Sequence, residues 1–435
     1  MLAISGFLRL GGVMDLVSKP VMTGFLFGLG MFVALSQLPR IFRVPAGSGN
    51  FFPRLWDLLT DLDQTQGWTL AVGLASIALL VVLARAAPKL PGTLVVLVLA
   101  IVLSALLDLK SRGVDVVGDL PRAVPHVAWP GAGWRDVLHL LAPAFGIMIV
   151  SAEAVGVART LAGQEGYRVS ANRDLIAMGG SNLAAGFTQG FVQSGGASQT
   201  MASERAGGKS QLASLVAAGI ILITGAFLTF LFEDLPEATL AAIVVVAISG
   251  FFRVDELRRF ARIRTSAIVF ALLALVGVLV AGVLPGLIIA AGLSFILLIQ
   301  RLSRPPVGRL ARDPASGAWG NAERHPDWVS TPEVLVVRAD GPLFYANAVH
   351  VKEHVIDFAS AADPKPRTLI LDLAGNHDLD VETLDTLGEL EDALAADSIE
   401  LRLGGVPASA LPLLQRSGLV SRLRVEPTLD AAVPS

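Results

Sequence analysis

Long apolar stretches, separated by short polar or glycine-rich segments, dominate the first 300 residues. A helix that crosses a bilayer needs about 20 mostly apolar residues. Nine stretches meet or approach that length: 17–39, 68–87, 90–108, 138–162, 171–191, 209–232, 236–252, 265–284 and 285–302. The pattern predicts a polytopic α-helical membrane domain over 1–304. We expect the short polar segment 197–206 to form a half-helix, which makes about ten helices in all.

Basic residues gather in alternate loops between these stretches. Arg85 and Lys89 lie between the second and third, and five arginines lie in 253–264, whereas 232–237 carries only acidic charges. Lysine and arginine are enriched in cytoplasmic loops of membrane proteins. We therefore expect a multi-pass protein of the cell's inner (plasma) membrane, embedded in the lipid bilayer, with both termini in the cytoplasm.

The pattern changes near residue 305. Residues 305–332 are rich in Pro, Gly, Arg and Asp and are expected to form a linker. From 333 to 435, strands at 333–338, 368–373 and 399–404 alternate with helices at 347–361, 381–396 and 408–417. Alternating strands and helices indicate a sheet covered by helices. The sequence thus predicts a separate cytoplasmic α/β domain over 333–435.

Composition narrows the class of protein. Of 435 residues, 53% are hydrophobic and 16% charged, and the mean hydropathy is +0.63. Such values are typical of a membrane protein. The net charge of −3 gives no indication of nucleic-acid binding, and without cysteine there is no thiolate chemistry. We expect no metal site and no cofactor. The sequence has no P-loop and no nucleophile–base pair, so we expect a protein that is not an enzyme.

One polar stretch inside the apolar region is the candidate ligand site. Gly195 and Gly196 precede Ala197-Ser198-Gln199-Thr200. A helix that begins after such a break presents unpaired N–H groups and a partial positive charge. The stretch predicts an anion or polar-substrate pocket, with a cytoplasmic loop as the alternative. Ser198 and Thr200 would donate hydrogen bonds to the anion or would only cap the helix.

Three further polar residues lie inside predicted spans. Glu153 is in the middle of 138–162, where a carboxylate is costly unless it is protonated, paired or facing water. Burial would raise its pKa, which suits proton coupling. The alternative is a structural partner for Arg159 or for backbone groups. Asn182 and Gln189 are expected to form hydrogen bonds between helices rather than to bind ligand.

Several motifs resemble those of the SulP family of inorganic anion transporters and occur in the family's order. Residues 16–25 (LVSKPVMTGF) resemble the start of its fifth helix, and 88–92 (PKLPG) the start of its seventh. Residues 189–212 carry QGF, GGASQ and AGGKSQL, which resemble its tenth. Residues 340–348 (DGPLFYANA) resemble the opening of its C-terminal STAS domain.

The resemblance implies secondary active transport of sulfate, bicarbonate or a related small anion. It implies a 7+7 inverted-repeat fold, an elevator-type mechanism, a coupling proton or sodium ion and a homodimer. Anions would bind between half-helices of the third and tenth helices, and Glu153 matches an acidic position on the eighth. Some members carry arginine where this chain has Gln199.

The resemblance covers the family's helices five to fourteen. We therefore expect an N-terminally incomplete fold, from a mis-started, truncated or complementing product. The alternative function is a non-transporting, membrane-anchored STAS protein or a remnant of such a transporter. The STAS domain is expected to bind a cytoplasmic regulatory protein. Glu382 occupies the position that is phosphorylated in related STAS domains, so we expect no phosphorylation switch there.

Overall fold

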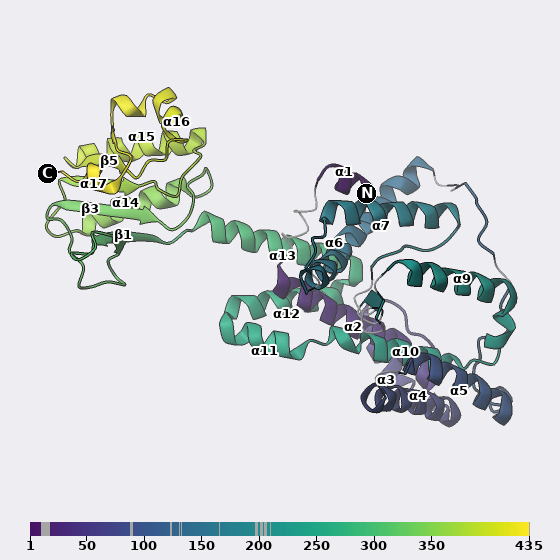
Figure 1. Ribbon diagram of the computed structural model, residues 1–435. Helices are drawn as coiled ribbons and strands as arrows, with labels where there is room; N and C mark the ends of the chain where they lie inside the picture. The colour runs from purple at the N-terminus through teal and green to yellow at the C-terminus, as the bar shows by residue number, and fades with distance from the viewer. Residues whose placement is uncertain are drawn as a thin grey trace. The chain divides into compact units, whose positions relative to one another are not determined.

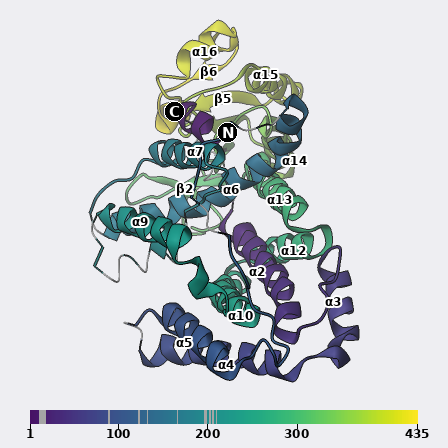
Figure 2. The same ribbon diagram turned by 90° about the vertical axis from the view of Figure 1, so that its right-hand side faces the viewer.

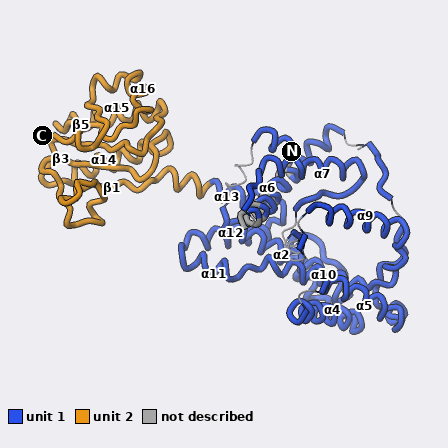
Figure 3. Tube along the Cα trace, viewed as in Figure 1, with its two compact units in different colours: residues 1–295 blue, residues 296–435 orange. Residues whose placement is uncertain are grey.

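The computed structural model describes residues 1–434 apart from 10–17, 88–89, 122–123, 130, 132, 165, 196–198, 201–202, 204–206 and 209. Within the helix 134–164, several side chains, including that of Glu153, are also outside the description. The chain forms two compact units, Met1–Phe295 and Ile296–Ser435 (Figure 3). The first is helical, and the second is built around a β-sheet.

The helices of the first unit follow the apolar stretches of the sequence (Figure 1). They are α1 (Leu2–Phe7), α2 (Lys19–Phe42), α3 (Phe51–Thr60), α4 (Gly67–Ala86), α5 (Gly92–Leu107), α6 (Trp134–Gln164), α7 (Ala171–Phe187), α9 (Leu212–Phe227), α10 (Glu237–Ile248), α11 (Val254–Ile263), α12 (Thr265–Ala281) and α13 (Val283–Ser303). The last turns of α13 belong to the second unit. Each of the nine predicted spans is therefore confirmed as a helix. The predicted half-helix 197–206 lies mostly outside the described residues.

Four helical runs among the described residues are long and apolar enough to cross a membrane. They are α2, α4, the run Glu237–Ile263 that contains α10 and α11, and α13. Three shorter helices, α5, α9 and α12, are also apolar. The short helices α1, α3 and α11 were not predicted, because none has the length of a spanning segment.

Helices α2 and α12 lie side by side, as Figure 1 and Figure 2 both show. A methyl group added at Gly24 would collide with the carbonyl group of Ala271. Glycine therefore allows the two backbones to approach closely, which is a common way of packing helices in membranes. Gly28 makes a similar approach one turn later, where a Cβ atom would lie 3.0 Å from the Leu275 carbonyl oxygen.

The amphipathic helix α3 covers the end of this helix pair. Its apolar side chains Phe51 and Leu58 are buried against Leu35 of α2 and Leu279 of α12. Two ion pairs then join neighbouring segments: Arg43 to Asp115 at 3.0 Å, and Arg40 to Glu237 at 3.6 Å. The arginines that follow the first span are thus paired with carboxylates of distant segments.

A second group of helices, α1, α6 and α7, has its own small core. Leu2 and Leu175 are buried there together with Ile147, Met148 and Met178. The Ser5 hydroxyl donates a hydrogen bond to the Met148 sulfur at 3.1 Å. This group contains both Glu153 and the helix that leads to the candidate site.

The second unit contains a six-stranded sheet with the order β2-β1-β3-β4-β5-β6. The strands are β1 (Val307–Arg312), β2 (Trp319–Asn321), β3 (Val334–Ala339), β4 (Thr368–Asp372), β5 (Glu400–Gly404) and β6 (Arg424–Val425). Neighbouring strands from β3 to β6 are parallel, whereas β1 pairs antiparallel with β2 and β3. The predicted strands β3, β4 and β5 are confirmed within one or two residues.

Helices cover both faces of this sheet. The helices α14 (Ala348–Ala361), α15 (Val381–Ala396) and α16 (Leu411–Arg416) pack on the face that carries Val337 and Leu371. The short helix α17 (Leu429–Ala432) packs on the other face, against Val336 and Ile370. Adjacent residues thus point to opposite cores, as the two-residue period of a strand requires.

Residues 305–332 contribute structure where the sequence predicted a linker. They form β1 and β2, and Trp319 of β2 donates a hydrogen bond through Nε1 to Asp430 at 2.9 Å. The segment was hard to recognise because β1 (VGRLAR) places only Leu310 and Ala311 in a buried environment. An antiparallel strand of this kind, next to the edge strand β2, lacks the continuous apolar run that marks a buried parallel strand.

Candidate functional site

A cavity of about 640 Å³ is lined by residues of α6 and α7, by residues 193–195, by Thr200 and by Gln211 and Ser214 at the start of α9. Its apolar wall comes from small side chains of α6 and α7, including Ala154, Ala158 and Ala177. Its polar residues are Asp174, Ser181, Gln193, Ser194, Thr200, Gln211 and Ser214. Hydroxyl, amide and backbone groups that converge on a cavity of this size are typical of a small-molecule site.

Gly195 lets the chain approach α6 at the wall of the cavity. A Cβ atom built at Gly195 would lie 2.8 Å from Cβ of Ala154, closer than two side chains can pack. A larger residue would therefore push the segment 193–195 away from α6. The close packing against Ala154 thus gives a steric reason for glycine at position 195.

Asn182 of α7 fixes the segment that leads into the candidate half-helix. Its Oδ1 accepts a hydrogen bond from the Gln193 backbone N–H at 2.9 Å, and its Nδ2 donates to the Gln193 carbonyl at 2.8 Å. Asn182 therefore forms hydrogen bonds to another segment, as expected, but its partner is the backbone of a non-helical segment and not another helix. One side chain thus satisfies both backbone polar groups of Gln193.

Gln189 has a different role from the one expected. It follows the end of α7 in a left-handed backbone conformation, with φ of 57°, and the next N–H, of Gly190, donates to the Ala185 carbonyl at 2.7 Å. Within the described part of the chain, the Gln189 side chain has no hydrogen-bond partner. The sequence offered no signal for this, since glutamine is uncommon in a left-handed turn.

The structure brings part of the predicted ligand set to the cavity. Gly195 and Thr200 line it, and Gln199 precedes Thr200 at the start of a helical turn. Gly196, Ala197 and Ser198 lie outside the described residues.

Glu153 is in α6, immediately before the cavity-lining Ala154. Its side chain is outside the description, as is that of Arg159, its alternative partner. The backbone therefore carries Glu153 to within one residue of the cavity wall.

Asp174 is a cavity residue that the sequence analysis did not single out. It lies in the first turn of α7, where an acidic residue is favoured by the helix dipole. This position near the end of a predicted span gave no reason to distinguish Asp174 from an ordinary helix-start carboxylate. Gln193 and Ser194 were also missed, because only tertiary structure brings the segment before the glycines to α6 and α7.

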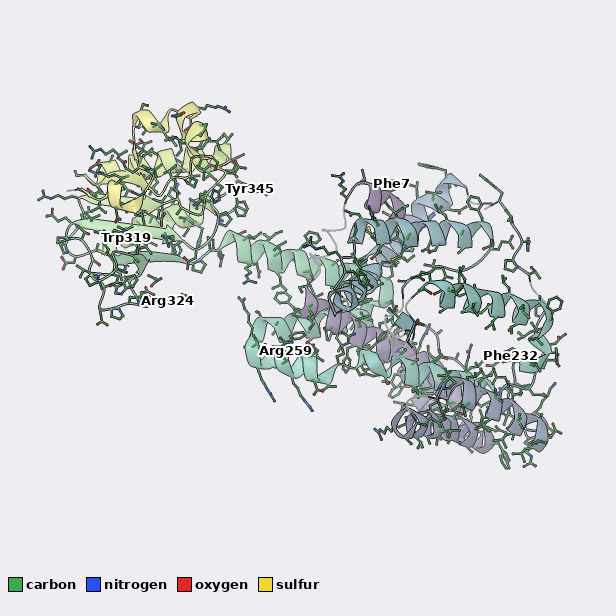
Figure 4. All side chains as sticks on the ribbon, in the orientation of Figure 1. Phe7, Phe232, Arg259, Trp319, Arg324 and Tyr345 are labelled. Atoms are coloured by element: carbon green, nitrogen blue, oxygen red, sulfur yellow. The ribbon has the colours of Figure 1, made fainter. Side chains whose placement is uncertain are left out.

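The loop before α14 is held by side chains from the segment that precedes α15. Asp380 accepts hydrogen bonds from the backbone N–H groups of Thr383 at 2.8 Å and Tyr345 at 2.7 Å. Burial raises the pKa of Asp380, but the contacts with Thr383 and Tyr345 outweigh it, and the pKa lies below its ordinary value. Tyr345 itself remains exposed (Figure 4). Asp380 therefore joins two segments that are far apart in sequence.

Glu382, at the position that is phosphorylated in related STAS domains, and Thr383, which follows it, differ in exposure. Glu382 is exposed in the first turn of α15. Thr383 is 1% exposed, and its hydroxyl has no hydrogen-bond partner among the described residues. A kinase could reach the Thr383 hydroxyl only after this helix start had opened.

The membrane-length helices, the polar cavity beside α6 and α7 and the separate sheet domain indicate a multi-pass membrane transporter with a C-terminal α/β domain. The sequence profile of the Sulfate permease family matches residues 1–274, and that of the STAS domain matches 325–432. The chain belongs to the sulfate permease family, whose members transport anions and are not enzymes.

One relative agrees with this assignment, and a solved structure matches the fold. A probable sulfate transporter of Mycobacterium tuberculosis (strain CDC 1551 / Oshkosh) is 30% identical over 421 residues, which cover 97% of this chain and 75% of that protein. The structure of the murine Solute Carrier 26 family member A9 anion transporter in the inward-facing state aligns with a TM-score of 0.88 at 23% identity, covering 99% of this chain and 72% of that one.

A third comparison concerns the helical unit. The transmembrane domain of the cyanobacterial bicarbonate transporter BicA aligns with a TM-score of 0.56 at 18% identity, covering 67% of this chain and 72% of that chain. The fold class predicted from the sequence, an inverted-repeat type of membrane transporter followed by a STAS domain, is thus confirmed.

Proposed function

We propose that the chain transports a small inorganic anion, sulfate or bicarbonate, and that the cavity beside Gly195 is its binding site. The supporting observation is the cavity itself, which is lined by Ser194, Gly195 and Thr200 together. Hydroxyl and backbone N–H groups are suitable donors for an oxyanion, and a helix N-terminus adds a partial positive charge. Ser198 and Gln199 would complete the donor set. The names of the relatives support sulfate and bicarbonate as the candidate anions.

Coupling to a cation is part of this proposal. Asp174 lines the cavity and Glu153 precedes a lining residue. An anion beside a carboxylate is repelled unless a proton or another cation accompanies it. We therefore propose proton symport with Glu153 as the proton-binding residue, and sodium as the alternative coupling ion.

The arrangement of the helices supports an elevator-type movement. The group of α1, α6 and α7 has its own core and contains the proposed site, whereas α2, α3 and α12 form another core. Movement of the first group past the second would carry the site across the membrane. We further propose a homodimer in the inner membrane with both termini in the cytoplasm. In this proposal 1–304 is the transport domain, and the STAS domain that follows binds a cytoplasmic regulator.

Anion flux into liposomes that contain the purified chain tests this proposal. Saturable uptake of sulfate or bicarbonate is expected. Thr200→Val should raise the anion concentration that gives half-maximal uptake. Thr188→Val is the matched control, because among the described residues the Thr188 hydroxyl bonds to carbonyls of its own helix alone, Ala184 at 3.0 Å and Ala185 at 3.3 Å. No saturable flux would favour the membrane-anchored STAS protein instead.

A further inference from the structure

The short helix α11 has an arginine-rich face that the anion cavity does not use. At about 100° per residue, Arg258, Arg259 and Arg262 lie on one face of the helix, and Leu257 and Phe260 lie on the other. Phe260 is only 8% exposed, whereas the three arginines are exposed. Figure 4 labels Arg259 on this helix. α11 is therefore attached to the protein by its apolar face and presents a cationic face outward.

The connections of α11 keep it close to the ends of membrane helices. The helical run that starts at Glu237 is a candidate span, and its charged residues beyond Glu237 all follow Phe252. Phe252 and Arg253, with ψ angles of 66°, interrupt the helix before α11. Arg264 alone, in an extended conformation, separates α11 from the apolar helix α12. With one or two residues on each side, α11 cannot extend far from the bilayer surface.

Its charges are only partly compensated. Residues 253–264 hold five arginines and two carboxylates, a net charge of +3. Glu256 is paired with Lys19 at 3.1 Å and, more distantly, with Arg259 at 3.9 Å, and Asp255 is paired with Arg258 at 3.4 Å. The Asp255 pair is exposed and therefore weak. Among the described residues, Arg262 has no carboxylate partner.

We propose that α11 lies in the membrane interface and that its arginine face binds the headgroup phosphates of anionic phospholipids. A short amphipathic helix with cationic residues on its polar face is suited to this position. Guanidinium groups bind phosphate oxygens in a bidentate manner, and anionic lipids attract basic segments at the membrane surface. The inference depends on the membrane location of the chain but not on the identity of the transported anion.

Energy transfer between α11 and labelled lipids tests the proposal. The chain has no cysteine, so Ala261→Cys provides a unique site for a donor dye on an exposed position of α11. The labelled protein is placed in phosphatidylcholine vesicles with a trace of acceptor-labelled phosphatidylglycerol or, for comparison, acceptor-labelled phosphatidylcholine. We expect stronger transfer to phosphatidylglycerol.

Replacement of the arginines should remove this preference. The attraction between one basic residue and an anionic membrane surface corresponds to about a fivefold enrichment of anionic lipid beside it. High salt screens this attraction. Arg262→Gln should therefore lower the enrichment about fivefold. The triple change Arg258→Gln, Arg259→Gln and Arg262→Gln should bring it close to that of phosphatidylcholine. The corresponding lysine triple variant should retain most of it.

A control with the same loss of charge separates local binding from general attraction. Arg324→Gln, Arg416→Gln and Arg424→Gln remove three exposed charges of the STAS unit. This control should leave lipid enrichment at α11 unchanged. Equal transfer to both lipids in the unsubstituted chain would overturn the proposal. Equal losses in the α11 variant and in the control would also overturn it. Arg262→Gln alone gives the answer if the triple variant does not fold.

Discussion

Asn182 offers a sharp test of how the candidate site is held in place. Asn182→Leu removes both hydrogen bonds to the Gln193 backbone, at 2.9 and 2.8 Å, and keeps a side chain of similar size. Each such bond contributes about 0.5–1.5 kcal/mol, so the loss is about 1–3 kcal/mol. At 1.4 kcal/mol per factor of ten, the ordered form of the segment 193–195 should become about 5- to 150-fold less favoured.

Two measurements follow this change. A nitroxide label on Ser194→Cys, unique because the chain has no cysteine, reports the mobility of the segment by electron paramagnetic resonance. We expect a more mobile spectrum with Asn182→Leu. The concentration of anion that gives half-maximal uptake should rise by no more than the factor above, since binding requires the ordered form. Asn182→Asp keeps the Oδ1 acceptor, so its label mobility and anion affinity should lie between those of the unsubstituted chain and those of Asn182→Leu.

Thr188→Val is again the control, because its hydroxyl bonds within its own helix and not to Gln193. An unchanged spectrum together with unchanged anion affinity in Asn182→Leu would show that this pair of bonds does not organise the site. Lower maximal uptake with unchanged affinity would show that Asn182 affects the conformational change of transport and not anion binding.

Four further predictions test the site, the coupling and the two folds. Ser198→Ala should weaken anion affinity about 10- to 150-fold, the equivalent of the 1.5–3 kcal/mol of a hydrogen bond to a charged group, and unchanged uptake affinity would reject Ser198 as a ligand. Glu153→Gln should abolish the dependence of uptake on an inward proton gradient, and surviving dependence would contradict proton coupling through this residue. Gly24→Leu should force α2 from α12 at the Ala271 carbonyl and lower the yield of folded protein, measured by gel filtration in detergent, whereas Gly219→Leu, at an open position of α9, should not. In residues 305–435, Asp380→Ala should lower the free energy of unfolding in urea by about 1–3 kcal/mol, since two N–H groups lose their acceptor. Because the pKa of Asp380 is lowered in the folded state, this loss should be complete near neutral pH and vanish as the pH falls through the lowered pKa. A loss of stability that does not depend on pH would contradict the prediction.

The apolar pattern alone determined the membrane helices, because burial in lipid demands a continuous hydrophobic run whatever the neighbouring helices are. It also determined β3, β4 and β5, whose buried residues form short apolar runs. The amphipathic helix α3 was missed, since its ten residues form a helix that becomes stable by packing Phe51 and Leu58 on other helices. The strands β1 and β2 were missed for the same kind of reason, because their stability comes from pairing, β1 with β3 and β2 with β1.

For the candidate site, the sequence identified the unusual chemistry, and the tertiary structure decided which residues meet. Polar side chains and helix-breaking glycines destabilise an apolar membrane region unless they form a site or a contact, so the segment around Gly195 could be recognised from its composition. That Gly195 lies against Ala154, and that Asn182 binds the Gln193 backbone, depends on α6 and α7 packing together. The participation of Asp174 likewise depends on the position of α7 beside the cavity, because nothing in the local sequence separates a cavity carboxylate from one that only stabilises a helix start.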